Sequence, residues 1–412
     1  MSKRIVVTGM GAISAAGNNV SHFSEYLFDN NNKLINTIAP ISLFTPEPHH
    51  ASMAAEVKNY DPAKNFSKAE LKHFDRFTQF ALLATDEAIT QSKLAFNDRP
   101  LAQRTCVVHG TSIGGQETIE QSYSLLFESD KKRAHPFTVP KLLPSSATSH
   151  ISMKYGIKGP AFTTSSACSS SGHALIMSVL MLRSNMVDVA ITGGAEACIT
   201  SGNFHAWDGL RVLSHDTCRP FSANRSGLII GEGAATLVLE TLDHALARGA
   251  DIYGEIVGVG MSSDAHNMIQ PLAEGAEMAM NAALQDADIL PSDIAYINAH
   301  GSGTKQNDKT ETYAIHQVFK AHAPQLKVSS TKAIHGHVLG AGAALESIAS
   351  ILAIEKQQCP PTKNFKENDD ECNLDYVPNQ AQPHGIEYAM SNSFAFGGLN
   401  TCIIFKKYIP KI

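Results

Sequence analysis

The sequence lacks any long apolar run: none of its stretches reaches the roughly 18 uninterrupted apolar residues that a membrane helix needs. The first apolar run, Ile5 to Val7, is interrupted at once by Thr8 and Gly9. We interpret it as the start of a buried strand rather than as part of a signal peptide. An excess of positive charge is also absent, because the formal net charge is −6. Nucleic acid is therefore not an expected partner.

Closely spaced cysteines are missing as well. The seven cysteines form an odd number, are scattered from Cys106 to Cys402, and include no Cys-x-x-Cys spacing. This distribution argues against a disulfide framework and against a zinc site. We therefore expect free thiols, a reducing cytoplasmic location and no bound metal.

What the chain does contain is the composition of a globular protein, with 43% hydrophobic and 17% charged residues among 412. Segments of strand and helix character alternate along it, which predicts an α/β fold with parallel sheets covered on both faces. Two successive rounds, each with an apolar or small-residue helix in its middle, predict a duplicated unit with a seam near Arg248 to Tyr253. We expect two fused halves, residues 1–250 and 251–412.

One short segment, TTSSACSSSG at Thr163 to Gly172, combines a cysteine with many serines. Residues 174–182 are apolar on nearly every face, which predicts a helix in the middle of a large core. Cys168 then lies at or just before the helix N-terminus, where free N–H groups and the helix dipole lower the pKa of a thiol. Cys168 is thus either a nucleophile or a buried structural cysteine followed by helix-capping serines.

Two histidines lie between glycines at predicted element ends. His300 follows a predicted strand in AHGSGT, and His337 precedes a small-residue helix in GHVLGAG. The carboxyl end of a parallel strand is where α/β sheets place reactive groups, and a cysteine with nearby histidines suits nucleophilic catalysis. The alternative is that both histidines only pack in the core or lie on the surface. The turn Asn392 to Gly398 could present backbone N–H groups to an oxyanion, although this signal alone is weak.

Basic residues gather in two places. Lys68, Lys72 and Arg76 have four-residue spacing, which puts them on one face of a helix predicted to run from a capping box at Ser67 to Gln91. The other group is the triplet Lys131, Lys132 and Arg133. Each is either a docking site for an acidic partner or a solvated surface.

Taken together, these motifs resemble those of the β-ketoacyl-acyl carrier protein synthases, the Cys-His-His condensing enzymes of fatty-acid and polyketide synthesis. The resemblance covers almost the whole chain and implies the thiolase fold, with two α/β halves in α-β-α-β-α layers, and a dimer. The motifs that carry it are VVTGMGAIS near the start, SSACSSSG around Cys168, GGAEA at 193–197, RPFSANRSG at 219–227, GEGAA at 231–235, SSDAH at 262–266, AHGSGT around His300, TKAIHGHVLGAG at 331–342 and SNSFAFGG at 391–398.

Three related protein classes fit less well. Thiolases carry a second catalytic cysteine in a Gly-rich C-terminal turn, where this chain has Phe396-Gly397-Gly398. Initiating condensing enzymes use Cys-His-Asn, whereas the third position here is His337. Chain-length factors lack the nucleophile, and Cys168 argues against that role.

The resemblance also implies roles for individual residues. Cys168 would take an acyl group from an acyl carrier protein, and His300 and His337 would stabilise the enolate formed when a malonyl-carrier protein loses CO₂. Lys332, paired with Glu346, would order the histidines. The backbone N–H groups of Cys168 and Phe396 would form an oxyanion hole, and no cofactor would be needed. The remaining implied residues are Glu346, Asp308, Ser302 and Thr304 as supporting groups, Ile113, Phe137 and Phe396 in the acyl pocket, and Lys68, Lys72, Arg76, Lys131, Lys132 and Arg133 at the carrier-protein docking site.

Some positions depart from the pattern of housekeeping elongation enzymes. They are Ser302 after His-Gly, Ala395 between two phenylalanines, Leu399 after Gly-Gly, and Ser222, Ser226 and Thr138 elsewhere. None removes a catalytic group, so the departures favour a specialised polyene or polyketide pathway and a chain-length-factor-like partner. The alternatives are a housekeeping homodimer, a non-catalytic subunit and a cysteine hydrolase of acyl thioesters.

Overall fold

The computed structural model describes residues 3–31, 34, 36–47, 51–129 and 133–410. Its main feature is a 10-stranded sheet made of two halves. The strands of each half have the same order when each half is read from its outer edge toward the middle of the sheet. Read from the two outer edges inward, one half is β5-β4-β6-β7-β1 and the other is β10-β9-β13-β14-β8. The halves meet where β1 pairs antiparallel with β8 through Ile5 and Ile256. This repetition confirms the predicted duplication.

The strands of the first half are β1 (Ile5–Ser14), β4 (Thr105–Gly110), β5 (Ala161–Thr164), β6 (Val189–Glu196) and β7 (Gly233–Thr241). Those of the second half are β8 (Gly254–Ser263), β9 (Ile294–Asn298), β10 (Lys327–Ser329), β13 (Tyr388–Ala395) and β14 (Leu399–Lys406). Two small ribbons pair β2 (Ala39–Pro40) with β3 (Met53–Ala54) and β11 (Gln358–Cys359) with β12 (Gln382–Pro383).

The α-helices are α1 (Val20–Leu27), α2 (Pro62–Asn65), α3 (Arg76–Ser92), α4 (Arg99–Gln103), α5 (Gln116–Glu128), α6 (Thr138–Leu142), α7 (Ser146–Tyr155), α8 (Ser170–Arg183), α9 (Ser201–Gly209), α10 (Leu242–Ala247), α11 (Ala273–Ala287), α12 (Lys305–Phe319), α13 (Lys332–His335) and α14 (Gly342–Lys356). Short 3₁₀ turns lie at Glu70–Lys72, Pro291–Asp293, Lys320–Gln325 and Leu339–Ala341. Within the described residues, no helix is long and apolar enough to cross a membrane.

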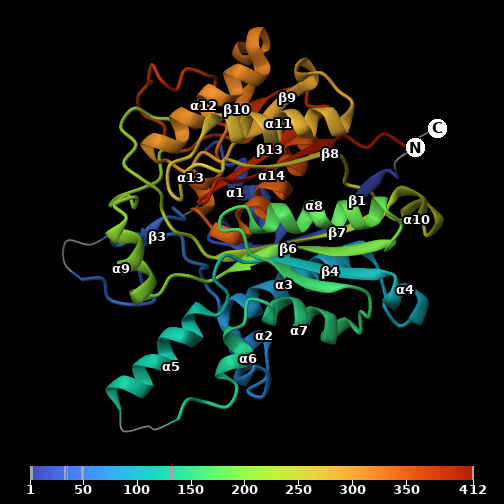
Figure 1. Ribbon diagram of the computed structural model, residues 1–412, viewed down its shortest axis with the longest axis vertical. Helices are drawn as coiled ribbons and strands as arrows, with labels where there is room; N and C mark the ends of the chain where they lie inside the picture. The colour runs from blue at the N-terminus through green and yellow to red at the C-terminus, as the bar shows by residue number, and fades with distance from the viewer. Residues whose placement is uncertain (1–2, 32–33, 35, 48–50, 130–132, 411–412) are drawn as a thin grey trace.

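The elements stack in five layers, as the resemblance implied (Figure 1). Helices α11 and α12 cover the outer face of the second half, and α3 and α7 cover the outer face of the first. Helices α8 and α14 lie between the two halves of the sheet, where they pack against each other and against strands of both. Helix α5 projects away from these layers.

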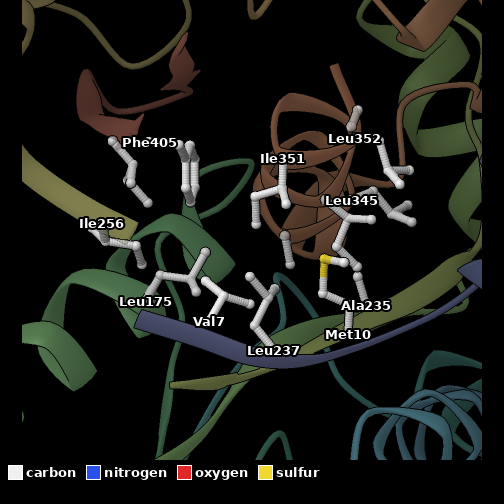
Figure 2. Close-up of a cluster of buried hydrophobic side chains, with 14 of the residues drawn as sticks. Val7, Met10, Leu175, Ala235, Leu237, Ile256, Leu345, Ile351, Leu352 and Phe405 are labelled. Atoms are coloured by element: carbon white, nitrogen blue, oxygen red, sulfur yellow. The ribbon is translucent and has the colours of Figure 1, made fainter. Parts of the chain in front are cut away.

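The central layer is buried because its helices have almost no polar face. Every residue of α14 from Gly342 to Ile354 is buried, and the apolar side chains of α8 lie in the same core, apart from the exposed Leu180. Figure 2 shows this core, in which Leu175 of α8 and Leu345 and Ile351 of α14 face β-strand side chains such as Val7. A helix that is apolar all round is stable only in such a position. The sequence interpretation of residues 174–182 is thereby confirmed.

Two expectations about local structure are wrong. The sheet is mixed rather than parallel, because each half adds an antiparallel pair to its parallel β-α-β strands. The helix predicted from Ser67 to Gln91 is also interrupted. The capping box of Ser67 and Glu70 forms, but it begins only a 3₁₀ turn, and α3 starts again at Arg76 with Asp75 as its own N-cap.

Candidate active site

Cys168 lies in a tight turn just before α8. Ala167 has a left-handed φ of 50°, which is uncommon for a residue with a side chain. Serine side chains hold this turn in place. Ser170 Oγ accepts a hydrogen bond from Ser166 N at 2.9 Å and donates to the Ala167 carbonyl at 2.7 Å, and Ser112 Oγ donates to the same carbonyl. The serine side chains therefore fix the turn that carries the cysteine, whereas no side chain among the described residues caps α8 itself.

The Cys168 thiol does not have the low pKa that its place near a helix N-terminus predicted. Burial raises the pKa of this thiol to about 11, although the Lys332 charge and the backbone N–H of Phe396, which donates to the sulfur, lower it in part. The desolvation of a thiolate in this enclosed position outweighs the helix dipole. The resting group is thus a neutral thiol, and it needs a base. His337 Nε2 lies 3.1 Å from Sγ.

The second predicted histidine, His300, faces the first across the same space. The two imidazole rings lie edge to face with centroids 5.3 Å apart. Burial and the nearby Lys332 charge hold the pKa of both histidines well below the usual value. Both rings are therefore neutral, and Nδ1 of each has no hydrogen-bond partner among the described residues.

Lys332 and Glu346 form a fully buried ion pair, as the resemblance implied. Lys332 begins α13, and Glu346 lies on the buried helix α14. A buried charge pair is costly to desolvate and is weak evidence for added stability. Its effect on the site is electrostatic, because the Lys332 charge lowers the pKa of Cys168, His300 and His337.

A carboxylate that the sequence interpretation missed holds His300. Glu311 of α12 accepts hydrogen bonds from the backbone N–H groups of His300 and Gly301, both at 2.8 Å. Burial raises the pKa of Glu311 to about 7. Its spacing of one helical turn from Asp308, directly after the His300 loop, was an available signal. Asp308 itself accepts from Gly303 N at 3.2 Å and from Phe221 N at 2.7 Å.

The reactive side chains open into one cavity of about 120 Å³. Ser302 and Thr304, hydrogen-bonded to each other at 2.9 Å, line it together with Cys168 and both histidines. Ligand sites commonly measure roughly 300–1,000 Å³, so this cavity is too small for an acyl chain. The other residues that line it are Trp207, Val212, Leu228, Asn267, Met268, Ile269, Gln270, Pro271, Gln306, Asn307, Phe394, Ala395, Phe396 and Gly398.

The two other predicted acyl-pocket residues have different positions. Ile113 packs into the apolar cluster of Cys168, Leu339 and Ala395. Phe137 does not line this cavity and is 36% exposed on the surface, against His73 and His135. A place for Phe137 in the acyl pocket across a dimer interface stays a prediction.

The predicted basic groups are only partly available as docking residues. Lys68, Lys72 and Arg133 are exposed. Arg76 is not, because its guanidinium forms a bidentate ion pair with the buried Glu232 and lies over the rings of Tyr60 and Phe80. It also shares no helix face with Lys68 and Lys72. Lys131 and Lys132 lie outside the described residues.

Sequence comparisons agree with this geometry. The model of the beta-ketoacyl synthase N-terminal domain matches residues 2–245, and that of the C-terminal domain matches residues 253–366. Nodulation protein E of Rhizobium sp. (strain N33) is 41% identical over 99% of this chain and 100% of its own length. A 3-oxoacyl-[acyl-carrier-protein] synthase 2 of Staphylococcus aureus (strain N315) is 42% identical over 99% of both chains.

Structural comparison gives the same answer. A solved structure described as the ishigamide ketosynthase/chain length factor superposes with a TM-score of 0.93 at 33% identity, over 99% of this chain and 100% of that chain. Both family models, the full-length relatives and the thiol facing two neutral histidines thus lead to one conclusion: the chain belongs to the beta-ketoacyl synthase family.

Proposed function

We propose that the chain catalyses decarboxylative Claisen condensation of a malonyl-carrier protein with an acyl group held on Cys168. The observation that carries this proposal is the 3.1 Å approach of His337 Nε2 to Cys168 Sγ in a cavity that His300 also lines. Cys168 supplies the nucleophile and His337 its base, and the two histidines supply donors for an oxyanion.

In the first step, the Cys168 sulfur attacks the carbonyl of an acyl thioester on the carrier protein. His337 Nε2 accepts the thiol proton and returns it to the departing carrier thiol, so the net change is exchange of one thioester for another. The backbone N–H groups of Cys168 and Phe396 are placed to donate to the oxyanion of the tetrahedral intermediate.

In the second step, a malonyl thioester enters and loses CO₂. Its carbonyl oxygen gains negative charge as the enolate forms, and His300 and His337 donate hydrogen bonds to that oxygen. His337 can act first as acceptor and then as donor, because nothing among the described residues fixes its Nδ1. The enolate carbon attacks the acyl carbonyl, and the Cys168 thiolate leaves and is reprotonated.

The two halves of the chain divide this work. Residues 1–250 carry the nucleophile, and residues 251–412 carry both histidines, Lys332 and Glu346. The matching strand orders of the two halves support this division. It places the reaction at the junction of two similar units.

A labelled acyl-carrier protein tests the reaction. We expect label on Cys168, followed by CO₂ release and a lengthened β-ketoacyl product once malonyl-carrier protein is added. A protein that acquires no label is a non-catalytic subunit. Release of free acid without a new carbon–carbon bond identifies a cysteine hydrolase.

We further propose a cytoplasmic, specialised polyene or polyketide pathway in which the chain works with a chain-length-factor-like homologue. The departures at Ala395 and Leu399 and the likeness to a ketosynthase/chain length factor structure support this. Exposed apolar side chains at the sheet edge and on α5 support a two-subunit assembly. Strand β5 lies at the sheet edge with Phe162 36% exposed, and α5 exposes Phe127 at 83%.

The similarity to a 3-oxoacyl-[acyl-carrier-protein] synthase 2 favours a second candidate, a homodimer for ordinary fatty-acid elongation. Expression alone and together with a neighbouring homologue that lacks the cysteine separates the two. The specialised assignment requires poor activity or poor solubility alone and rescue by the homologue. A stable homodimer that elongates saturated acyl chains at full rate assigns the chain to fatty-acid synthesis.

A further inference from the structure

Glu196, the last residue of β6, is a buried carboxylate outside the reaction described above. Its oxygens accept hydrogen bonds from two segments that are distant in sequence and from the neighbouring Cys198. One is the turn after β4, and the other is the turn that follows His337. The donors are Thr111 Oγ1 at 2.9 Å, Ser112 N at 2.6 Å, Ile113 N at 3.3 Å, Gly340 N at 3.0 Å and Cys198 Sγ at 3.4 Å.

Glu196 is one of the buried carboxylates of the chain that bind only neutral groups, as Asp75 and Glu311 do. Glu232 pairs with Arg76, Glu240 with Arg248 and Glu346 with Lys332, whereas no cation among the described residues forms an ion pair with Glu196. A buried charge satisfied only by neutral donors is costly. Its charge also raises the pKa of the Cys168 thiol, which opposes formation of the nucleophile. Neither an ion pair nor thiol activation therefore explains the residue.

What Glu196 holds together is part of the apolar cluster that contains Cys168. Ile113, whose N–H it binds, and Leu339, next to Gly340, pack in the apolar cluster of Cys168. The two segments touch directly at Gly340, because a Cβ there would lie 2.4 Å from Ser112 N. Only glycine permits this approach, and the Glu196 carboxylate joins the backbone on both sides of it.

We propose that Glu196 is a positioning residue that fixes Ile113 and Leu339 beside Cys168 and thereby sets which acyl chains the cysteine accepts. This inference rests on the proposed function, and it names the determinant of acyl selectivity. Glu196 touches neither the sulfur nor the histidines by any hydrogen bond found in the described residues. Its effect therefore belongs to acyl loading and not to malonyl decarboxylation.

The test is Glu196→Gln, since an amide keeps one acceptor oxygen and turns an NH₂ group toward donors. We expect the ratio of kcat/KM for short and long acyl-carrier proteins to change by about tenfold, the size of discrimination that one displaced methylene produces. Malonyl decarboxylation, measured in a Cys168→Gln background, should change by less than about threefold, because decarboxylation depends on the two histidines.

Two matched controls keep the test decisive. Thr111→Val removes one donor and should move the chain-length ratio in the same direction, whereas Thr111→Ser keeps the hydroxyl and should not. If Glu196→Gln does not fold, this pair decides. Glu240→Gln removes a buried carboxylate that binds Thr8, His244 and Arg248, so it should lower stability without altering the ratio.

An unchanged ratio in both Glu196→Gln and Thr111→Val overturns the inference, even if overall activity falls. Failure of the proposed function would be seen separately, in the wild-type protein, which would acquire no label on Cys168 and form no condensation product. A normal wild-type reaction with an unaltered ratio in the variants refutes the role of Glu196 alone.

Discussion

The indole of Trp207 stacks on the ring of Phe396, with centroids 5.8 Å apart and planes 25° from parallel. Both rings line the cavity at Cys168, and the Phe396 backbone N–H donates to the sulfur. Because the cavity is only about 120 Å³, an acyl chain can enter only if this pair or its neighbours move.

This arrangement predicts a fluorescence signal, since Trp207 is the one tryptophan of the chain. Acylation of Cys168 should change the emission of Trp207, because the stacked Phe396 ring must shift. The measurement is emission during titration with acyl-carrier protein, with acylation followed by mass spectrometry. Cys168→Ala should show no change. Full acylation with unaltered emission would mean that the chain enters elsewhere.

Substitution of the nucleophile should separate the two half-reactions. Cys168→Ala should abolish condensation while leaving the melting temperature near that of the wild type, because the change is small. Cys168→Gln should also abolish condensation but retain malonyl decarboxylation, because the side-chain amide imitates the acylated cysteine. Product analysis and CO₂ release measure these outcomes. Normal elongation by Cys168→Ala would exclude the mechanism.

The two histidines should differ in one respect. His300→Ala and His337→Ala should each slow decarboxylation by about 10²–10³, the usual cost of one donor to a developing oxyanion. Only His337 lies beside Sγ, at 3.1 Å, so His337→Ala should also slow acyl transfer to Cys168. Rapid single-turnover labelling measures that transfer. Equal effects of both variants on labelling would contradict the assignment of His337 as the base.

Docking of the carrier protein should depend on the exposed lysines and not on Arg76. Carrier proteins of this type are acidic, and the chain carries a net charge of −6, so a local basic surface is needed. Replacing Lys68 and Lys72 by Glu should raise KM for carrier-bound substrate and weaken its salt dependence. A pantetheine-linked substrate should react as before. Equal losses on both substrates would indicate damage to the fold.

Arg76→Ala tests the other side of this distinction. It should destabilise the protein by about 3–5 kcal/mol, because it leaves the buried Glu232 carboxylate without its partner. The measurement is chemical denaturation of the wild type and the variant. A stability equal to that of the wild type, with a selective loss of carrier-protein affinity, would return Arg76 to the docking surface.

A buried histidine away from the cavity gives a pH dependence. Burial lowers the pKa of His109 to about 3, so between that value and about 6.5 the unfolded chain binds a proton that the folded one does not. Stability from a neutral His109 is complete above about pH 6.5 and falls by about 1.4 kcal/mol per pH unit below it. His109→Gln removes this contribution. Urea denaturation of the wild type and of His109→Gln at several pH values should therefore give stabilities that converge at low pH. Stabilities of the two proteins that change in parallel with pH would refute the assignment.

The sequence was informative where a pattern is local. The repeated alternation of strands and helices predicted the duplicated α/β unit, and the apolar run after Cys168 predicted a central buried helix. The glycines around His300 and His337 indicated the reactive groups. The resemblance, and not a local pattern, implied the pairing of Lys332 with Glu346.

The errors concern features set by tertiary packing. The pKa of Cys168 depends on burial among residues from both halves, which no helix-end signal reveals. Arg76 has the spacing of a surface residue, but Glu232, 156 positions away, holds it inside. Glu196 binds backbone N–H groups of residues 112, 113 and 340, and such donors leave no trace in the sequence.

The antiparallel pairing of β1 with β8, which joins the two halves, has a consequence for the synthesis and folding of the protein. Synthesis of the chain produces Cys168 long before His337, 169 positions later, so an unfinished chain contains the thiol without its base. The reactive pair exists only after the second half has folded onto the first. Return of activity during refolding therefore reports the docking of the halves, whereas return of helical signal reports the folding of each half.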